Sequence, residues 1–235
     1  MPESFEIPVA SDRPLEVIGD SAISLVDGKA ESTPGWEWAM MMSGLSSAIK
    51  RYNAALGVKT SLEARIAAGE ALWWIASANE FLLGRISGLR PAEYYRGLGE
   101  TKTGRQIGGL VYLRNRAGHQ FIKGLSVTDE VSQKLAIVDD EGNHLRDVTL
   151  RRTVTYPMRP HMTAPSGGFR FPDALPPASS NHRETLNRDR YYSQELAGGL
   201  VHQVLPSIHG ALDRALHFDW DAEDHLSMSV LVRRM

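Results

Sequence analysis

The chain has 235 residues, of which 42% are hydrophobic and 23% charged, a composition typical of a folded protein with a buried core. It has no cysteine, which excludes disulfide scaffolds, thiolate metal sites and cysteine nucleophiles, and its net charge of −2 excludes a bulk polycation. The sequence starts without a basic-then-apolar leader and has no apolar run of the roughly 18 residues that a membrane span needs. We therefore expect a cytoplasmic protein with no membrane partner.

The first hundred residues predict short strands followed by two helices. Residues 1–31 contain brief apolar alternations broken by proline and glycine, which favour an arm with strand-like segments. Three- and four-residue apolar spacing predicts a helix over about 36–56, and Thr60 with Glu63 forms the capping box of a second helix that ends near Gly84. The face of this second helix that we expect in the core carries Leu62, Ile66, Gly69, Trp73 and Ala76. Residues 84–100 are rich in glycine and predict a turn-rich connector.

The rest of the chain predicts two more helices around a β-hairpin. A third helix runs from Thr103, which forms a capping-box signal with Gln106, to about Leu125. Residues 134–158 alternate around an acidic turn and predict the hairpin, and 157–177 contain six of the twelve prolines and predict a loop or flap. A last long helix is expected over 187–218, kinked at Pro206, with a weak strand over 226–232.

These elements predict a mainly α protein, an antiparallel helical bundle with a β-hairpin and proline-rich insert before the last long helix. We divide the chain into an N-terminal arm, residues 1–31, and a single helical domain, residues 32–235, that contains the insert 134–180.

Arg114 is anomalous because it falls inside the apolar stripe of the third helix. At about 100° per residue, with Ile107 at 0°, the apolar positions cluster near 0° and Arg114 lies at about 340°. An unpaired buried guanidinium is costly. Either Arg114 pairs with a carboxylate of the second helix, for which Glu70 and Glu80 are candidates, or part of the stripe faces a cleft or a subunit interface.

Positive charge gathers around this helix. Residues 101–128 and 148–172 contain nine lysines and arginines and no acid. Such a distribution is expected at the site of a phosphate-bearing ligand. The alternative is that these basic residues face solvent and pair with acids elsewhere in the chain.

The segment Leu113-Arg114-Asn115-Arg116-Ala117-Gly118-His119-Gln120 resembles the signature of the HEPN superfamily, in which four to six residues separate an arginine, often followed by asparagine, from a histidine. It is the only arginine–histidine pair at that spacing in the chain, and it lies in a predicted long helix. The resemblance covers the helices, about 36–125 and 187–218. It implies a helical bundle and, in many members, a metal-independent ribonuclease of toxin–antitoxin or antiphage systems.

The resemblance implies a catalytic set of Arg114, Asn115 and His119, with no cofactor and no metal. It further implies a homodimer that shares one site, RNA as substrate, a 2′,3′-cyclic phosphate product, and an antitoxin or defence-system partner protein. One toxin subgroup carries a tyrosine two residues after the histidine, which its antitoxin modifies. Phe121 stands there in this chain, so that form of neutralisation is not expected.

Two other functions remain open on the sequence. The helices and their basic face would also suit a non-catalytic module that binds nucleic acid or protein. In a structural or assembly protein, Arg114 would be an ion-paired residue of the core or an interface. His202 and His209 share a helix face but lack the spacing and third ligand of a metal site. We expect a core position for the remaining aromatic and sulfur-rich segments, Trp36, Trp38, Trp73-Trp74 and Met40-Met41-Met42.

Overall fold

The computed structural model of the chain describes residues 5–12, 25–26, 29–30, 34–117, 125–138, 140–142, 144–157, 159–175, 183–219 and 227–235. Within them the chain is mainly helical, as the sequence predicts. The helices are α1 (Pro34–Ala55), α2 (Ser61–Phe81), a π-helical extension η2 (Leu82–Ser87), α3 (Pro91–Leu98), α4 (Lys102–Ala117), α6 (Arg183–Glu195) and α7 (Val201–Ala215).

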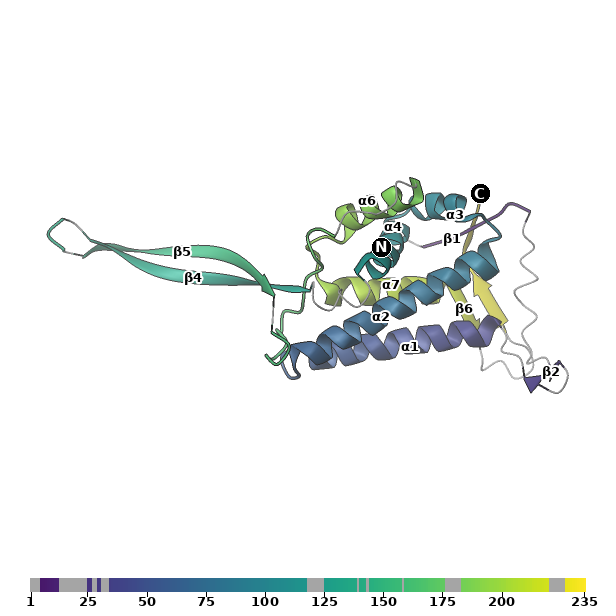
Figure 1. Cartoon of the computed structure of the whole chain (residues 1–235), viewed down its shortest axis with the longest axis horizontal. Coiled ribbons are helices and arrows are strands. Elements are labelled where there is room, and N and C mark those ends of the chain that lie inside the picture. Colours follow the sequence, from purple (N-terminus) through teal and green to yellow (C-terminus); the bar gives the residue numbers. More distant parts are fainter. Residues whose placement is uncertain are drawn as a thin grey trace.

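The described strands form two-stranded sheets. Strand β1 (Ile7–Val9) pairs in parallel with β8 (Val232–Arg234), which joins the two ends of the chain at one edge of the bundle (Figure 1). Phe5, Ile7 and Val9 are buried there. The antiparallel pairs are β2 (Leu25–Val26) with β3 (Lys29–Ala30), β4 (Ser126–Val138) with β5 (His144–Pro157), and β6 (Leu216–Asp219) with β7 (Ser227–Val230).

Helices α1 and α2 form the hairpin on which the bundle is built, and their boundaries agree with the sequence prediction. The turn between them contains Gly57 at a φ of 72°, a left-handed conformation that glycine adopts without strain. Thr60 caps α2 with the predicted capping box, since its hydroxyl accepts from the Glu63 N–H while the Glu63 carboxylate accepts from the Thr60 N–H.

The predicted core face of α2 is wrong at Leu62, Ile66 and Trp73, whereas Ala76 is buried as predicted. Small side chains such as Ala64, Ala68 and Ala71 are buried, whereas Leu62, Ile66 and Trp73 are 42%, 49% and 47% exposed. The buried side of α2 combines these alanines with Leu72, Ile75 and Phe81. The predicted core position of Trp38, Met41 and Met42 is confirmed, whereas that of Trp36 and Met40 is wrong because about half of each side chain is exposed.

The segment predicted as a connector over 84–100 contains helix α3, so that prediction is wrong. Pro91 occupies the first turn of α3, where its missing N–H costs nothing, and Glu93 bonds back to Arg90. Asn79 of α2 holds α3 in place through the buried hydroxyls of Tyr94 and Tyr95, at 3.2 and 3.0 Å.

Helix α4 crosses the middle of the bundle and packs against α2, α3, α6 and α7. The Thr101 hydroxyl accepts from the Gly104 N–H at 3.0 Å, so the cap lies two residues before the predicted one at Thr103. The described part of this helix ends at Ala117, and the predicted continuation over 118–124 lies outside the described residues. Leu125 is buried and directly precedes β4.

The predicted single helix over 187–218 is also wrong, because two helices, α6 and α7, occupy this part of the chain. Gly198 separates them at a φ of 68°, and Phe171 exchanges backbone hydrogen bonds with Gly198 and Gly199. Pro206 lies inside α7, which continues past it to Ala215. The predicted strand over 226–232 is confirmed by β7 and the start of β8.

The predicted hairpin exists, and β4 begins earlier than expected, at Ser126. Strands β4 and β5 form a long two-stranded arm that projects from the body beside the turn between α1 and α2 (Figure 1). The loop over 159–175 then returns to the body. It is ordered, as one of the two sequence alternatives proposed, and it contributes Ala164, Phe169 and Phe171 to the core. In the described part of the chain, no helix is both long enough and apolar enough to cross a bilayer.

Candidate functional site

The last turn of α4 carries the two described residues of the predicted catalytic set. Arg114 is half-buried and Asn115 is exposed. The Arg114 guanidinium donates from Nη1 to Asn115 Oδ1 at 3.0 Å, which holds the two side chains together at the helix end. Arg114 and Arg116 also place positive charge at the C-terminus of α4, where the helix dipole favours it.

The carboxylates predicted as alternative partners of Arg114 lie elsewhere. Glu70 accepts from Arg51 Nη2 at 2.5 Å across the α1–α2 hairpin. Glu80 lines a groove on the α1 side of α2. Among the described residues Arg114 forms no ion pair, so its guanidinium is only partly covered and not locked to an acid.

Part of the positive charge near α4 serves the fold. Arg105 pairs with Glu195 of α6 at 2.6 Å and donates to the Gly99 carbonyl, and Arg170 donates to the Gly198 carbonyl at 2.7 Å. Arg105 thus pairs with an acid elsewhere in the chain, as the alternative interpretation of the charge pattern expects, whereas Arg170 is held by a backbone carbonyl. The basic surface available to a ligand is therefore smaller than the sequence count indicates.

Helix α6 adds polar groups to the α4 surface that the sequence analysis missed. Arg188 lies over the Tyr95 ring, 4.5 Å from its centroid. Burial and then the nearby carboxylate of Asp189 raise the pKa of Tyr112, which lies one turn before Arg116 on α4. The alternating charges at 188–190 were the available signal, but only the fold shows that Arg188 lies near Gly108 of α4 and Asp189 near Tyr112.

The remaining members of the predicted motif, Gly118 and His119, lie outside the described residues, as does Phe121. The site is therefore described through Arg114 and Asn115. The chain is described again from Leu125, which is buried at the root of the arm.

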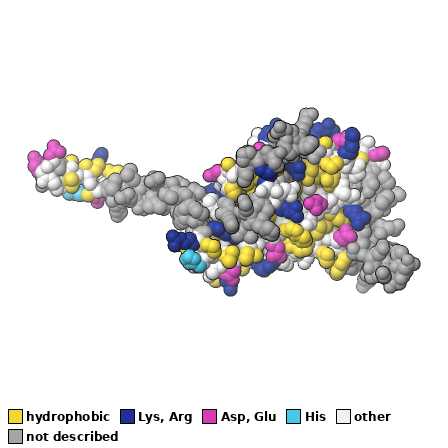
Figure 2. Space-filling view, in the orientation of Figure 1, with side chains coloured by type: hydrophobic (Ala, Val, Ile, Leu, Met, Phe, Trp, Pro, Cys, Tyr) yellow, Lys and Arg dark blue, Asp and Glu magenta, His cyan; other side chains and the backbone are white. Residues whose placement is uncertain are grey.

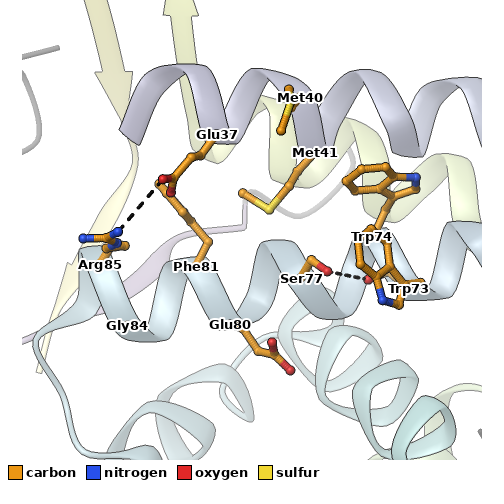
Figure 3. A pocket seen from close by; sticks show the side chains of 10 residues that line it. All are labelled: Glu37, Met40, Met41, Trp73, Trp74, Ser77, Glu80, Phe81, Gly84 and Arg85. Carbon is orange, nitrogen blue, oxygen red and sulfur yellow. Dashed lines mark hydrogen bonds and ion pairs between the residues drawn. The ribbon is translucent and has the colours of Figure 1, made fainter. Parts of the chain in front are cut away.

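A second surface feature is an open groove of about 580 Å³ between α1 and α2 (Figure 3). Met40, Met41, Trp73, Trp74 and Phe81 give it an apolar floor. Glu37 and Arg85 lie at one end of the groove, 3.9 Å apart. This groove was not predicted, because Trp73 was expected to lie in the core.

In the parts of the chain that the structure covers, no group of three or more histidine, aspartate or glutamate side chains is placed to hold an ion. His202 packs against the backbone of Gly168, where an added methyl group would lie 2.5 Å from the imidazole Nδ1. His202 is therefore a packing residue.

The comparisons with known proteins identify no relative. No protein-family model matches the chain, and neither the curated proteins nor the solved structures give a match.

Proposed function

We propose that this chain is a metal-independent endoribonuclease of the HEPN type. The observation that carries the proposal is the Arg114–Asn115 pair at the end of α4, where a half-exposed guanidinium without an ion pair among the described residues precedes His119 by five positions. The mainly helical bundle around α4 also supports it. A function in toxin–antitoxin or antiphage defence rests on the sequence resemblance.

The chemistry follows from the residue types. RNA cleavage begins when the ribose 2′-oxygen attacks the adjacent phosphorus and ends when the bond from phosphorus to the 5′-oxygen breaks, which leaves a 2′,3′-cyclic phosphate and a 5′-hydroxyl. A histidine takes the 2′-hydroxyl proton and a histidine returns a proton to the 5′-oxygen, because an imidazole changes charge near neutral pH. A second copy of the chain would supply the second His119.

Arg114 stabilises the phosphorane in this scheme. Its planar donors match the oxygens of a phosphate and are already held by Asn115. Asn115 thus has two tasks, to orient the guanidinium and to contact the substrate.

The test is cleavage of a mixed-sequence, 5′-labelled RNA by the full chain in the presence of EDTA. We expect cyclic-phosphate products, and a loss of rate of roughly 10²–10⁴-fold for His119→Ala and roughly 10²–10³-fold for Arg114→Ala. Lys102→Ala is the matched control, since Lys102 is an exposed basic residue at the opposite end of the same helix and its removal leaves the rate unchanged. Circular dichroism checks that each variant is folded.

Two results would contradict the proposal. Salt-sensitive RNA binding that persists in His119→Ala, without cleavage by the wild-type chain, would identify a nucleic-acid-binding module. A loss of self-association in Arg114→Ala, with neither binding nor cleavage of RNA, would identify an assembly protein.

A further inference from the structure

The β4–β5 arm is a long two-stranded ribbon, most of which lies beyond the helical body. Thirteen residue pairs join its strands, which at ~3.4 Å per residue gives a length of ~40 Å. A two-stranded hairpin alone in water is marginally stable. The arm projects away from the bundle (Figure 1), so its distal part has no cover from its own chain.

The tip of the arm combines acidic and apolar side chains. Val138 and Leu145 are 52% and 62% exposed, large fractions for apolar residues. Asp140, Glu141 and Asp147 are exposed beside them, and Figure 2 shows the acidic side chains at this end. Negative charge at the tip disfavours insertion of the arm into a nucleic-acid groove, because it would meet phosphates. The partner of the arm is therefore a protein.

The root of the arm combines basic and apolar side chains. A groove of about 350 Å³ between the end of α1 and the start of α2, named the root groove here, is lined by Arg51, Ala54, Ala55, Lys59, Glu63, Ile66 and Ala67. Lys59 and the adjacent Arg159 are exposed and form no ion pair among the described residues. Glu63 is already engaged by the N-cap at Thr60. Basic side chains gather where the arm leaves the body (Figure 2).

The backbone fixes the root groove beside the arm. The carbonyls of Pro160 and Met162, which follow β5, accept from the N–H groups of Leu62 and Ser61 at the start of α2. Ala164 donates to the Lys59 carbonyl at 2.8 Å. An arm that points away from this groove does not place its own tip there, whereas the arm of another molecule does.

From these observations we propose that two copies of the chain pair through their arms, side by side and antiparallel, with each tip in the root groove of the other copy. A two-fold axis across two identical antiparallel arms puts every tip at the partner's root. The pairing brings Asp140 to Lys59 and places Val138 and Leu145 against the apolar floor formed by Ala54, Ala55, Ile66 and Ala67.

This pairing is a different contact from the one that the proposed ribonuclease site needs, because antiparallel arms of ~40 Å hold the two bodies apart, whereas that site brings two copies of His119 together. Neither the arm nor the root groove includes Arg114, Asn115 or His119. A failure of one proposal leaves the other standing, since RNA cleavage and arm contact are measured separately.

The test uses the absence of natural cysteines, since a disulfide can then form only between introduced residues. Full-length Asp140→Cys and Lys59→Cys chains are purified separately, mixed and mildly oxidised. We expect a disulfide-linked pair in the mixture and not in either chain alone. Asp12→Cys mixed with Lys59→Cys is the matched control, because Asp12 is an exposed acid next to β1, away from the arm.

Two outcomes would overturn the pairing. Cross-linking of Asp140→Cys chains alone would place the tips together and exclude an antiparallel arrangement. The absence of any link in the mixture, with wild-type chain that sediments as a monomer, would exclude arm contact altogether.

Exchanging the charges of Asp140 and Lys59 tests the same contact in a second way. Asp140→Lys is expected to weaken self-association roughly tenfold, because it sets two like charges together. Adding Lys59→Asp in the same chain restores opposite charges and is expected to recover the loss. Sedimentation measures both, and a double variant no better than Asp140→Lys would contradict the contact between these two side chains.

Discussion

At the scale of single residues, the buried tyrosines determine how the protein responds to high pH. Burial raises the pKa of Tyr52 to about 12, against an opposing hydrogen bond of 3.1 Å from the Phe169 N–H to its hydroxyl. Burial likewise raises the pKa of Tyr94, Tyr95 and Tyr192. Above pH 10 the unfolded chain therefore loses phenolic protons that the folded chain keeps.

The free energy of unfolding is expected to fall as pH rises from about 10 to 12, by about 1.4 kcal/mol per pH unit for each such tyrosine. Tyr52→Phe removes one of these groups, so its stability depends less steeply on pH in that range. At neutral pH the same variant is less stable by about 1 kcal/mol, since the Phe169 N–H loses its acceptor. Urea unfolding at several pH values measures both effects, and an unchanged slope would show that Tyr52 ionises freely in the folded state.

The candidate site also depends on particular residues, and the sequence predicted it only in part. The spacing of Arg114, Asn115 and His119 is visible in the chain, because a local motif needs no tertiary information. The exposure of Arg114 is not visible, since the sequence placed it mid-stripe and the fold leaves it half-covered at a helix end. The part played by Arg105 was likewise hidden, because its partner Glu195 lies ninety residues away.

At the scale of elements, glycine sets the distance between α4 and α6. A methyl group added at Gly109 would lie 2.8 Å from Leu196 Cδ1 and 3.0 Å from the backbone nitrogen of Tyr192. The backbone of α6 cannot yield as a side chain does. Gly109→Ala is therefore expected to destabilise the fold by about 1–3 kcal/mol through overpacking.

Gly84→Ala is the matched control for this prediction. Gly84 is exposed in η2 with no other atom within 4 Å of the added methyl group, so alanine there is expected to be neutral or to stabilise by up to about 1 kcal/mol. Thermal unfolding of the two variants and the wild type separates the cases. Equal effects of the two substitutions would mean that helix propensity, and not the α4–α6 distance, determines the outcome.

The elements also show where sequence periodicity reaches its limit. Capping chemistry located the start of α2 correctly, because Thr60 and Glu63 act within one turn. Periodicity predicted an apolar stripe on α2 but not which side of the helix is buried, because the side that packs inside the bundle is rich in alanine. The apolar rhythm over 187–218 continues past Gly198, whose left-handed conformation depends on hydrogen bonds to Phe171 from another segment.

At the scale of the whole molecule, the predicted insert over 134–180 has two structurally different parts. The β4–β5 arm reaches outward (Figure 1), and Val127 at its root is buried in the core. The loop over 159–175 closes the bundle, with Phe169 and Phe171 fully buried and Arg170 bridged to Ser126 and Leu200. The arm is thus separable from the body, whereas the loop is part of its core.

This difference predicts unequal effects of two changes. Replacing residues 129–154 with an Asn-Gly turn joins Thr128 to Thr155, which already face each other in the ladder, and keeps the two pairs nearest the body. At a protein concentration low enough for a monomer, we expect the melting temperature to shift by less than about 4 °C. Phe171→Ala leaves a cavity worth about 3–5 kcal/mol and is expected to lower the melting temperature by roughly 10 °C.

Circular dichroism at 222 nm follows both unfolding transitions. If shortening the arm lowered the melting temperature as much as Phe171→Ala does, the arm would belong to the folding unit, and its stability would not need a second molecule. A small shift together with lost self-association would show that the chain keeps a complete core without the arm, and that the arm acts between molecules.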